Sequence, residues 1–298
     1  MRFNIIGSGY IAQELTSFIS SCRHSVNLFT HRRPLISCDY INTVPFPKSF
    51  KAWKSLLEYE CDITIFLHTV PSSVFQSASQ SVQSPEISEY LSNTKQYFDS
   101  LGNLNLSAGL IYASSCSVPT SLGYAPGQVD PSLFVNGYSL FKYLIELQIL
   151  GSPISSAAQI LRISNPYGCS LIEYLPSSIL NNIIKASFSH TVYQSTLPLD
   201  ATRDFLHISD LIKAIYSSAE RWSSGIYSLG YGRSFSLSEI FVHLSSTGLH
   251  VPEYRFISSS RPQIISSEVS VSDFKQKFCW EPSVTVEEGI RQTFASLE

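Results

Sequence analysis

Two residues in the middle of the chain have the types and spacing needed for coupled proton and hydride chemistry. Tyr138 and Lys142 are four residues apart in a segment with helical periodicity, so they share one face of a helix. A phenol has a pKa of about 10 and is a poor base near neutrality. A neighbouring ammonium and a positively charged nicotinamide ring would favour the phenolate. Tyr138 could then take a proton from a hydroxyl as a hydride leaves the same carbon, or return that proton to a ketone.

A run of small polar residues supplies a third group. Residues 114–117 read Ser-Ser-Cys-Ser and follow a short apolar segment. Because substrates of open α/β sheets bind beyond the carboxyl ends of the strands, a hydroxyl here could hold the reacting oxygen. Ser115 is the predicted residue, and a register shifted by one would make it Ser114. The alternative is structural: a core tyrosine, a surface lysine and a serine that caps a strand end.

A glycine-rich turn near the start of the chain predicts a dinucleotide site. Residues 7–12 read Gly-Ser-Gly-Tyr-Ile-Ala. In this pattern Gly7 permits a tight turn, Gly9 lets a pyrophosphate approach the backbone, and Ala12 lets helix and strand pack closely. The N-terminus of the following helix then faces the phosphates with unpaired N–H groups and a favourable dipole. The predicted cofactor-binding residues of this turn are Gly7, Gly9, Tyr10, Ile11 and Ala12.

The residues after the second predicted strand bear on the type of cofactor. A carboxylate about 20 residues beyond the glycines would bind the ribose 2′-hydroxyl of NAD. The chain has His31, Arg32 and Arg33 there instead. Because a guanidinium group can pair bidentately with a phosphate, these three residues favour NADP over NAD. A solvated basic loop is the alternative.

Short apolar segments alternate with helical periodicity along the first half of the chain. The predicted strands are 3–6, 26–30, 63–67, 110–113 and 160–163, and the predicted helices are 11–19 and 138–150. This alternation predicts an α/β fold, a doubly wound parallel Rossmann sheet with helices on both faces. Residues 72–85 and 117–131 are predicted loops. We expect a dinucleotide-binding domain over 1–165, with later returns near 203–230, and a smaller substrate-binding lobe over 166–202 and 231–298.

Composition narrows the class of protein. At 298 residues and 44% hydrophobic content the chain can bury a sizeable core, and its low charged content of 14% is not typical of disorder. The formal net charge is −3 with no long basic run, so we expect no nucleic-acid partner. No apolar run reaches the length of about 18 residues that a membrane span needs. The six cysteines are scattered without a CxxC pair, which predicts reduced thiols, a cytoplasmic protein and no metal site.

Several segments together resemble the extended short-chain dehydrogenase/reductases, specifically the NAD-dependent epimerase/dehydratase family, over nearly the whole chain. The similar segments are 112–118 (YASSCSV), 138–142 (YSLFK), 161–168 (LRISNPYG), 203–210 (RDFLHISD), 230–236 (GYGRSFS), 261–262 (RP) and 278–282 (FCWEP). Each is loose alone, but their order along the chain makes the combination specific.

The resemblance implies roles for particular residues. Ser115, Tyr138 and Lys142 would be catalytic, and Tyr138 and Lys142 would also contact the cofactor. The substrate-binding residues would be Ser115, Asn165, Arg203 and Arg261, with Asn165 on the sugar nucleotide and the two arginines on its diphosphate. Paired guanidinium groups suit a diphosphate, although each arginine has an alternative role in an ion pair or a solvated loop. The resemblance also implies a homodimer and a place in lipopolysaccharide biosynthesis.

Departures from the family pattern bear on the reaction. The glycine turn is one residue shorter than GxxGxxG, Val118-Pro119 replaces the common Val-Tyr, and the Asn expected on the helix near Thr94 falls at Tyr90. No Asp-Glu pair follows Ser115, which disfavours the dehydration that the family's 4,6-dehydratases perform.

The expected function is hydride transfer at a ring carbon, C4, of a nucleotide diphosphate sugar. Reduction of a 4-keto sugar with NADPH and epimerisation with tightly bound NAD are the two possible outcomes. The alternatives are a non-catalytic sensor that binds NADP and a protein partner, and a bare Rossmann scaffold.

Overall fold

The structure is a computed structural model that describes residues 1–31, 37–46, 50–68, 75, 84–104, 108–119, 133–168, 176, 178–258, 266 and 269–298. It divides into two units, Met1–Arg162 with Trp222–Tyr227, and Ile163–Arg221 with Ser228–Glu298. The predicted boundary after residue 165 lies three residues beyond this division. Of the predicted returns near 203–230, the segment Trp222–Tyr227 groups with the first unit. The two predicted loops, 72–85 and 117–131, lie mostly outside the described residues.

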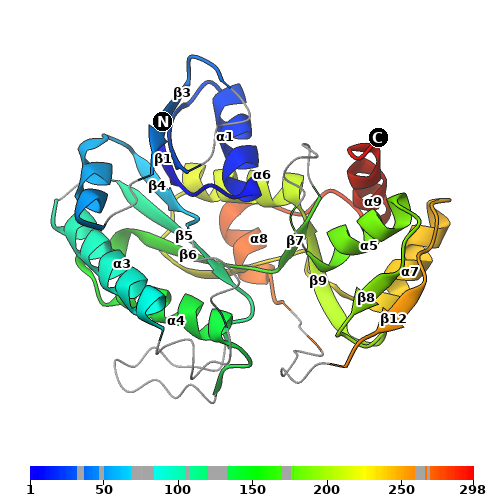
Figure 1. Ribbon diagram of the computed structural model, residues 1–298. Helices are drawn as coiled ribbons and strands as arrows, with labels where there is room; N and C mark the ends of the chain where they lie inside the picture. Colours follow the sequence, from blue (N-terminus) through cyan, green and yellow to red (C-terminus); the bar gives the residue numbers. More distant parts are fainter. Residues whose placement is uncertain are drawn as a thin grey trace. The chain divides into compact units, whose positions relative to one another are not determined.

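A seven-stranded sheet in the order β10-β6-β5-β4-β1-β2-β3 is the main element of the fold (Figure 1). Its strands are β1 (Arg2–Ile6), β2 (Ser25–Thr30), β3 (Ile41–Pro45), β4 (Ile63–Phe66), β5 (Gly109–Ser115), β6 (Ala158–Ile163) and β10 (Gly225–Leu229). Neighbours from β3 to β5 pair in parallel. The chain order reverses at β1, between β2 and β4, and such a switch point is where ligands of doubly wound sheets bind. The predicted fold class is confirmed.

The helical elements of the first unit are α1 (Tyr10–Ser21), η1 (Phe50–Glu58), α3 (Pro85–Asn103), α4 (Gly137–Leu150) and η4 (Pro153–Ala157). The helices predicted at 11–19 and 138–150 are therefore confirmed. The Asn136 side chain caps α4 by accepting the N–H of Ser139 at 2.9 Å. This cap fixes the first turn of α4, and with it the direction in which Tyr138 points. The sequence pattern does not predict β3, an edge strand in which Asn42 and Thr43 are exposed and interrupt the apolar signal.

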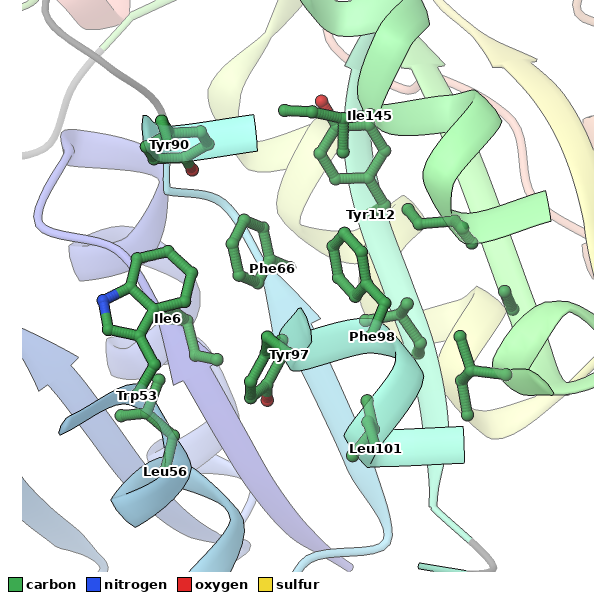
Figure 2. Close-up of a cluster of buried hydrophobic side chains, with 14 of the residues drawn as sticks. Ile6, Trp53, Leu56, Phe66, Tyr90, Tyr97, Phe98, Leu101, Tyr112 and Ile145 are labelled. Carbon is green, nitrogen blue, oxygen red and sulfur yellow. The ribbon is translucent and has the colours of Figure 1, made fainter. Parts of the chain in front are cut away.

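Aromatic side chains fill the core between the sheet and helix α3 (Figure 2). Phe66 of β4 lies 5.9 Å and 5.3 Å from the ring centroids of Tyr97 and Phe98 on α3. The Phe66 ring also lies 6.3 Å from that of Tyr112 on β5. Trp53 of η1 packs edge-on against Tyr97 at 6.1 Å. Burial of apolar area contributes about 25 cal/mol per Å², so this cluster holds α3 firmly against β4 and β5.

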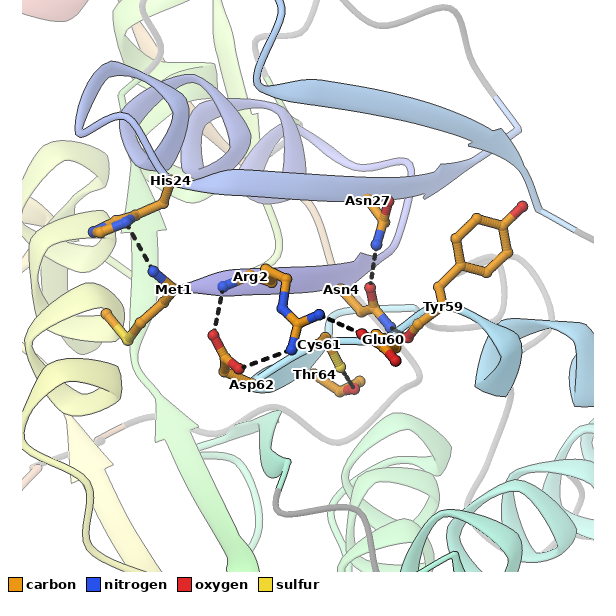
Figure 3. A network of polar contacts seen from close by, with 10 residues as sticks. All are labelled: Met1, Arg2, Asn4, His24, Asn27, Tyr59, Glu60, Cys61, Asp62 and Thr64. Atoms are coloured by element: carbon orange, nitrogen blue, oxygen red, sulfur yellow. Dashed lines mark hydrogen bonds and ion pairs between the residues drawn. The ribbon is translucent and has the colours of Figure 1, made fainter.

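Polar contacts tie together the amino-terminal ends of the strands (Figure 3). Arg2 of β1 pairs with Glu60 at 2.5 Å and with Asp62 at 3.5 Å. Beside them the Asn27 amide of β2 donates to Asn4 Oδ1 of β1 at 2.8 Å. Exposed ion pairs contribute only about 0–1 kcal/mol. We therefore assign these contacts to strand register, at the end of β1 remote from the glycine turn.

The second unit contains β7 (Asn165–Tyr167), α5 (Ile179–Phe188), β8 (Tyr193–Ser195), β9 (Thr202–His207), α6 (Ile208–Glu220), β11 (Ser234–Ser236), α7 (Leu237–Ser246), β12 (Tyr254–Phe256), α8 (Ser272–Phe278) and α9 (Val286–Ala295). Its small sheets run β11-β9-β7 and β12-β8. Buried Asp204 of β9 accepts the N–H groups of Tyr231 and Gly232 at 2.8 and 2.7 Å. Within the described part of the chain, no helix is both long and apolar enough to cross a membrane.

Candidate functional site

The two glycines of the turn after β1 have different surroundings. A Cβ atom on Gly7 would lie 3.1 Å from Leu67 Cβ, immediately after β4, so a side chain here would press β1 and β4 apart. A Cβ atom on Gly9 would meet nothing within 4 Å. Packing therefore requires Gly7, whereas the space beside Gly9 is open to a ligand.

Helix α1 starts at this turn with Gly9 as its N-cap. Gly9 has no side chain to cap the helix, and the first turn carries no acidic residue. Tyr10, Ile11 and Ala12 therefore present the positive end of the helix dipole, as an anion site requires. Ala12 is fully buried, which allows the close packing of helix and strand. All five residues predicted from the glycine pattern lie together at the carboxyl end of β1.

The end of β2 is connected to the same turn. The backbone N–H of His31 donates to Ser8 Oγ at 3.0 Å, and the His31 ring is exposed. Arg32 and Arg33, the other two residues predicted to favour NADP, lie outside the residues that the structure describes. Of the three residues predicted to favour NADP, His31 therefore lies next to the glycine turn.

The three predicted catalytic residues come together where β5 meets α4. The Ser115 hydroxyl is hydrogen-bonded to Tyr138, and it lies 2.9 Å from Ser117 Oγ. Lys142 Nζ donates to the Ala113 carbonyl at 2.8 Å and lies 5.7 Å from the centroid of the Tyr138 ring. Tyr138 is partly buried, whereas Lys142 is only 3% exposed.

The hydroxyls of the two adjacent serines have different partners. That of Ser114 donates to the Glu146 carboxylate and is buried. That of Ser115 is the one beside Tyr138. Of the two registers left open by the sequence, the geometry therefore favours Ser115 as the residue that can share a reacting oxygen with Tyr138.

Burial dominates the electrostatics of this cluster. It raises the pKa of Tyr138 to about 12, and the Ser115 hydrogen bond offsets only part of the rise. The protein around the phenol therefore disfavours its anion. The lowered pKa predicted from the sequence also depends on a positively charged nicotinamide ring and stays a prediction. Tyr138 therefore keeps its proton at neutral pH. Burial also lowers the pKa of Lys142 to about 8, although the Glu146 carboxylate acts in the other direction.

His68, for which the sequence pattern gave no prediction, follows β4 beside the glycine turn, with its backbone nitrogen 3.5 Å from where a Cβ atom on Gly7 would lie. Its ring stacks on Phe46 at 4.5 Å and on Tyr90 at 5.5 Å. Its Nδ1 lies 3.0 Å from the Tyr90 hydroxyl. Burial lowers the pKa of His68 to about 4, and the charges of His31 and Lys142 act in the same direction. The available signal was a polar residue directly after an apolar strand, at the edge where ligands bind.

Lys142 and the glycine turn lie at the same edge of the sheet. Ile6, Phe66 and Tyr112 pair in register across β1, β4 and β5, so Gly7 and Ala113 both follow at the carboxyl ends of these parallel strands. The Ala113 carbonyl is the one that accepts from Lys142. Tyr90, which stands where an Asn was expected near Thr94, holds His68: its hydroxyl donates to the His68 carbonyl at 3.1 Å.

Of the substrate-binding residues implied by the resemblance, Asn165 and Arg203 belong to the second unit, whereas Ser115 belongs to the first. Asn165 begins β7 and donates from its side chain to the Asp204 carbonyl of β9 at 2.9 Å. Arg203 of β9 is buried and donates to the Thr202 carbonyl at 2.7 Å. Burial lowers the pKa of Arg203. Arg261 lies outside the residues that the structure describes.

The cysteines of the described segments, Cys22, Cys38, Cys61, Cys116 and Cys279, are free thiols. Over those same segments no group of three or more His, Cys, Asp or Glu side chains could hold a metal ion. Cys116 Sγ donates to the Arg162 carbonyl at 2.8 Å, so the thiol in the serine run helps tie β5 to β6.

A doubly wound sheet with a glycine turn after β1 and a Ser-Tyr-Lys cluster after β5 has the architecture of a Rossmann-type dinucleotide-binding protein. No protein-family model matches the chain. A curated relative, dTDP-4-dehydro-6-deoxyglucose reductase of Escherichia coli, is 23% identical over 195 residues, or 63% of this chain. The chain spans 61% of the length of that relative.

Solved structures match the chain from end to end. UDP-glucuronic acid 4-epimerase from Bacillus cereus is 16% identical, with a TM-score of 0.79 over 100% of this chain and 99% of its own. UDP-glucose 4-epimerase from Thermotoga maritima is 15% identical, with a TM-score of 0.78 over 100% and 98%. The Thermus thermophilus UDP-glucose 4-epimerase in complex with NAD is 16% identical, with a TM-score of 0.77 over 99% and 98%. The chain has the fold of these epimerases, which agrees with the resemblance to the extended short-chain dehydrogenase/reductases.

Proposed function

We propose that the chain is an oxidoreductase that reduces a 4-keto sugar of a nucleotide diphosphate sugar with NADPH. The observation that carries the proposal is the Ser115, Tyr138 and Lys142 cluster, on the same sheet edge as the glycine turn. The curated relative is named as a reductase of a 4-dehydro sugar nucleotide, which supports this substrate class. Because both Tyr138 and Lys142 are present, we favour an enzyme over a sensor or a bare scaffold.

The residues around the glycine turn fit a dinucleotide. Open space beside Gly9 and the N-terminus of α1 suit a pyrophosphate. A bound nicotinamide dinucleotide would supply the hydride. His31, at the end of β2, stands near the position where a carboxylate would select NAD, and Arg32 and Arg33 follow it in the sequence. This is the basis for proposing NADPH over NADH.

The protonation state of Tyr138 suits the reductive direction. Since its pKa is raised to about 12, the phenol carries a proton that it can donate to the ketone oxygen as the hydride reaches the carbon. Ser115 would hydrogen-bond the same oxygen and hold it in line. The Lys142 ammonium, 5.7 Å from the ring centroid, would then stabilise the phenolate that remains.

The test supplies NADPH and a series of 4-keto-6-deoxy sugar nucleotides and follows nicotinamide absorbance. We expect one NADPH to be consumed for each sugar reduced, and slower consumption of NADH. Turnover without added cofactor, together with NAD retained through purification, would instead identify an epimerase, the activity named for the structural neighbours. If no nicotinamide nucleotide binds at all, the proposal fails.

Gly9 offers a test of the cofactor site that does not depend on the substrate. We expect Gly9→Ala to fold with nearly unchanged thermal stability, because its Cβ atom meets no protein atom within 4 Å. The same methyl group would occupy the space proposed for the pyrophosphate, so we expect NADPH affinity to fall at least about tenfold, equivalent to about 1.4 kcal/mol. Calorimetry and a melting curve measure the two effects. Unchanged affinity would place the cofactor elsewhere.

From the resemblance we also propose a homodimer that acts in the cytoplasm. Reduction of a keto sugar nucleotide would provide a deoxy sugar for a surface glycan, such as lipopolysaccharide. Light scattering of the purified protein tests the oligomeric state, and a monomeric mass at working concentration would contradict that part of the proposal.

A further inference from the structure

One turn after Lys142 on α4, a carboxylate lies fully inside the protein. Glu146 is 0% exposed, and its partners come from two strands of the sheet. Arg162 of β6 forms a two-pronged pair with it, Nε at 3.1 Å and Nη2 at 2.7 Å. The Ser114 hydroxyl of β5 donates to the same carboxylate. Glu146 thus connects α4, β5 and β6 through one side chain.

Three side-chain contacts join β5 to α4. The Ala113 carbonyl accepts from Lys142 at 2.8 Å, the Ser114 hydroxyl donates to Glu146, and the Ser115 hydroxyl bonds to Tyr138. Three consecutive residues of the strand therefore contact three residues on one face of the helix. Of these contacts, the one from Ser114 has a partner, Glu146, that is also anchored to β6.

A buried ammonium needs a compensating charge. Burial favours loss of the Lys142 proton, and Glu146 is the group that opposes this effect. Residues at i and i+4 of a helix are neighbours, so the Glu146 carboxylate is close enough to interact electrostatically with the Lys142 ammonium. A buried ion pair can often be replaced by apolar side chains without loss of stability. Stability alone therefore gives no reason to retain Glu146 and Arg162 here.

We propose that Glu146 is a positioning residue: anchored by Ser114 and Arg162, it places a buried negative charge one helical turn from Lys142 and holds the Lys142 ammonium on the Ala113 carbonyl beside Tyr138. This inference rests on the proposed function of the cluster. The measurement that tests it needs neither substrate nor cofactor, so the inference about Glu146 and the proposed function can fail separately.

The test is a titration of Lys142 in the intact protein by NMR, with 13C at Cε of the lysines and with Lys142→Met to assign the signal. The groups that face Lys142 are Glu146 and Tyr138 on α4, Tyr112 on β5 and His68 after β4. We expect a midpoint near pH 8 in the unaltered chain. E146Q should move it down by about one unit or more, because the opposing charge is gone. An unchanged midpoint would overturn the proposal.

Two further variants separate charge from packing. S114A removes one hydrogen bond but keeps the carboxylate, so its Lys142 midpoint should stay within a few tenths of a unit of the original. E146Q leaves Arg162 buried without its carboxylate; should it not fold, E146M/R162M removes both charges with side chains of suitable size. The double variant should also show a lowered midpoint. A midpoint that stays near pH 8 in a folded double variant would overturn the proposal.

The pH dependence of kcat tests whether Glu146 affects the reaction through Lys142. If the protein reduces keto sugars, the alkaline limb of its kcat profile should shift downward in E146Q by the same amount as the NMR midpoint. A limb that stays in place while the lysine midpoint moves would show that Glu146 does not act through Lys142 in catalysis. If no turnover is found for any substrate, the proposed function fails, while the lysine titration still decides what Glu146 does to Lys142.

Discussion

Tyr138→Phe should abolish turnover and leave cofactor binding close to that of the unaltered chain. The phenol is the proton donor of the proposed reduction, and general acid catalysis is typically worth about 10² to 10⁴ in rate. The ring itself packs against Phe75 at 5.4 Å, a contact that Phe can keep. Stopped-flow or steady-state nicotinamide absorbance measures kcat, and fluorescence of bound NADPH measures the affinity.

Tyr143→Phe is the matched control for this prediction. Tyr143 lies on the same helix, is buried, and packs against Phe134 at 5.3 Å rather than against Ser115. It should keep full activity and near-normal stability. Equal rates for Tyr138→Phe and the unaltered chain would rule out Tyr138 as the proton donor. Equal losses in both variants would show that any tyrosine lost from α4 damages the enzyme through folding.

Lys142→Met should lower both cofactor affinity and turnover, by about tenfold to a hundredfold each. A hydrogen bond to a charged group contributes about 1.5–3 kcal/mol, and about 1.4 kcal/mol corresponds to a factor of ten. The ammonium would lie next to the cofactor ribose as well as next to Tyr138. Met fills the buried space without the charge, so the effect reports on the ammonium.

The pH dependence of turnover tests the same role of the Lys142 ammonium. Since burial lowers the pKa of Lys142 to about 8, the ammonium is present below that pH and is lost as pH rises through it. Turnover of the unaltered enzyme should therefore decline above pH 8, and this decline should be absent from Lys142→Met. Lys95→Met is the control, because Lys95 is exposed and pairs with Asp99 at 2.6 Å. Persistence of the alkaline limb in Lys142→Met would assign it to a different group.

Local sequence patterns were sufficient for the main elements and for much of the candidate site. Alternating apolar segments predicted strands that the structure has as β1, β2, β4, β5 and β6. The glycine turn and the Tyr-Lys spacing are short-range signals, set by backbone conformation and helical periodicity, which act over about four residues. The strand order, and with it the switch point at β1, comes from the pairing of segments far apart in sequence and is seen only in the structure.

Only the tertiary structure decided which partners these residues meet. Ser114 reaches Glu146 thirty-two residues further along the chain, which leaves Ser115 as the serine beside Tyr138. Burial, which depends on packing of the whole unit, raises the pKa of Tyr138, an effect that the Tyr-Lys spacing does not contain. Glu146 has no local pattern that distinguishes it from an ordinary polar residue of a helix, and the only local signal for His68 is its place directly after an apolar strand. Their roles arise from contacts between segments far apart in sequence, and the fall in dielectric on burial strengthens those interactions in a way that no spacing rule contains.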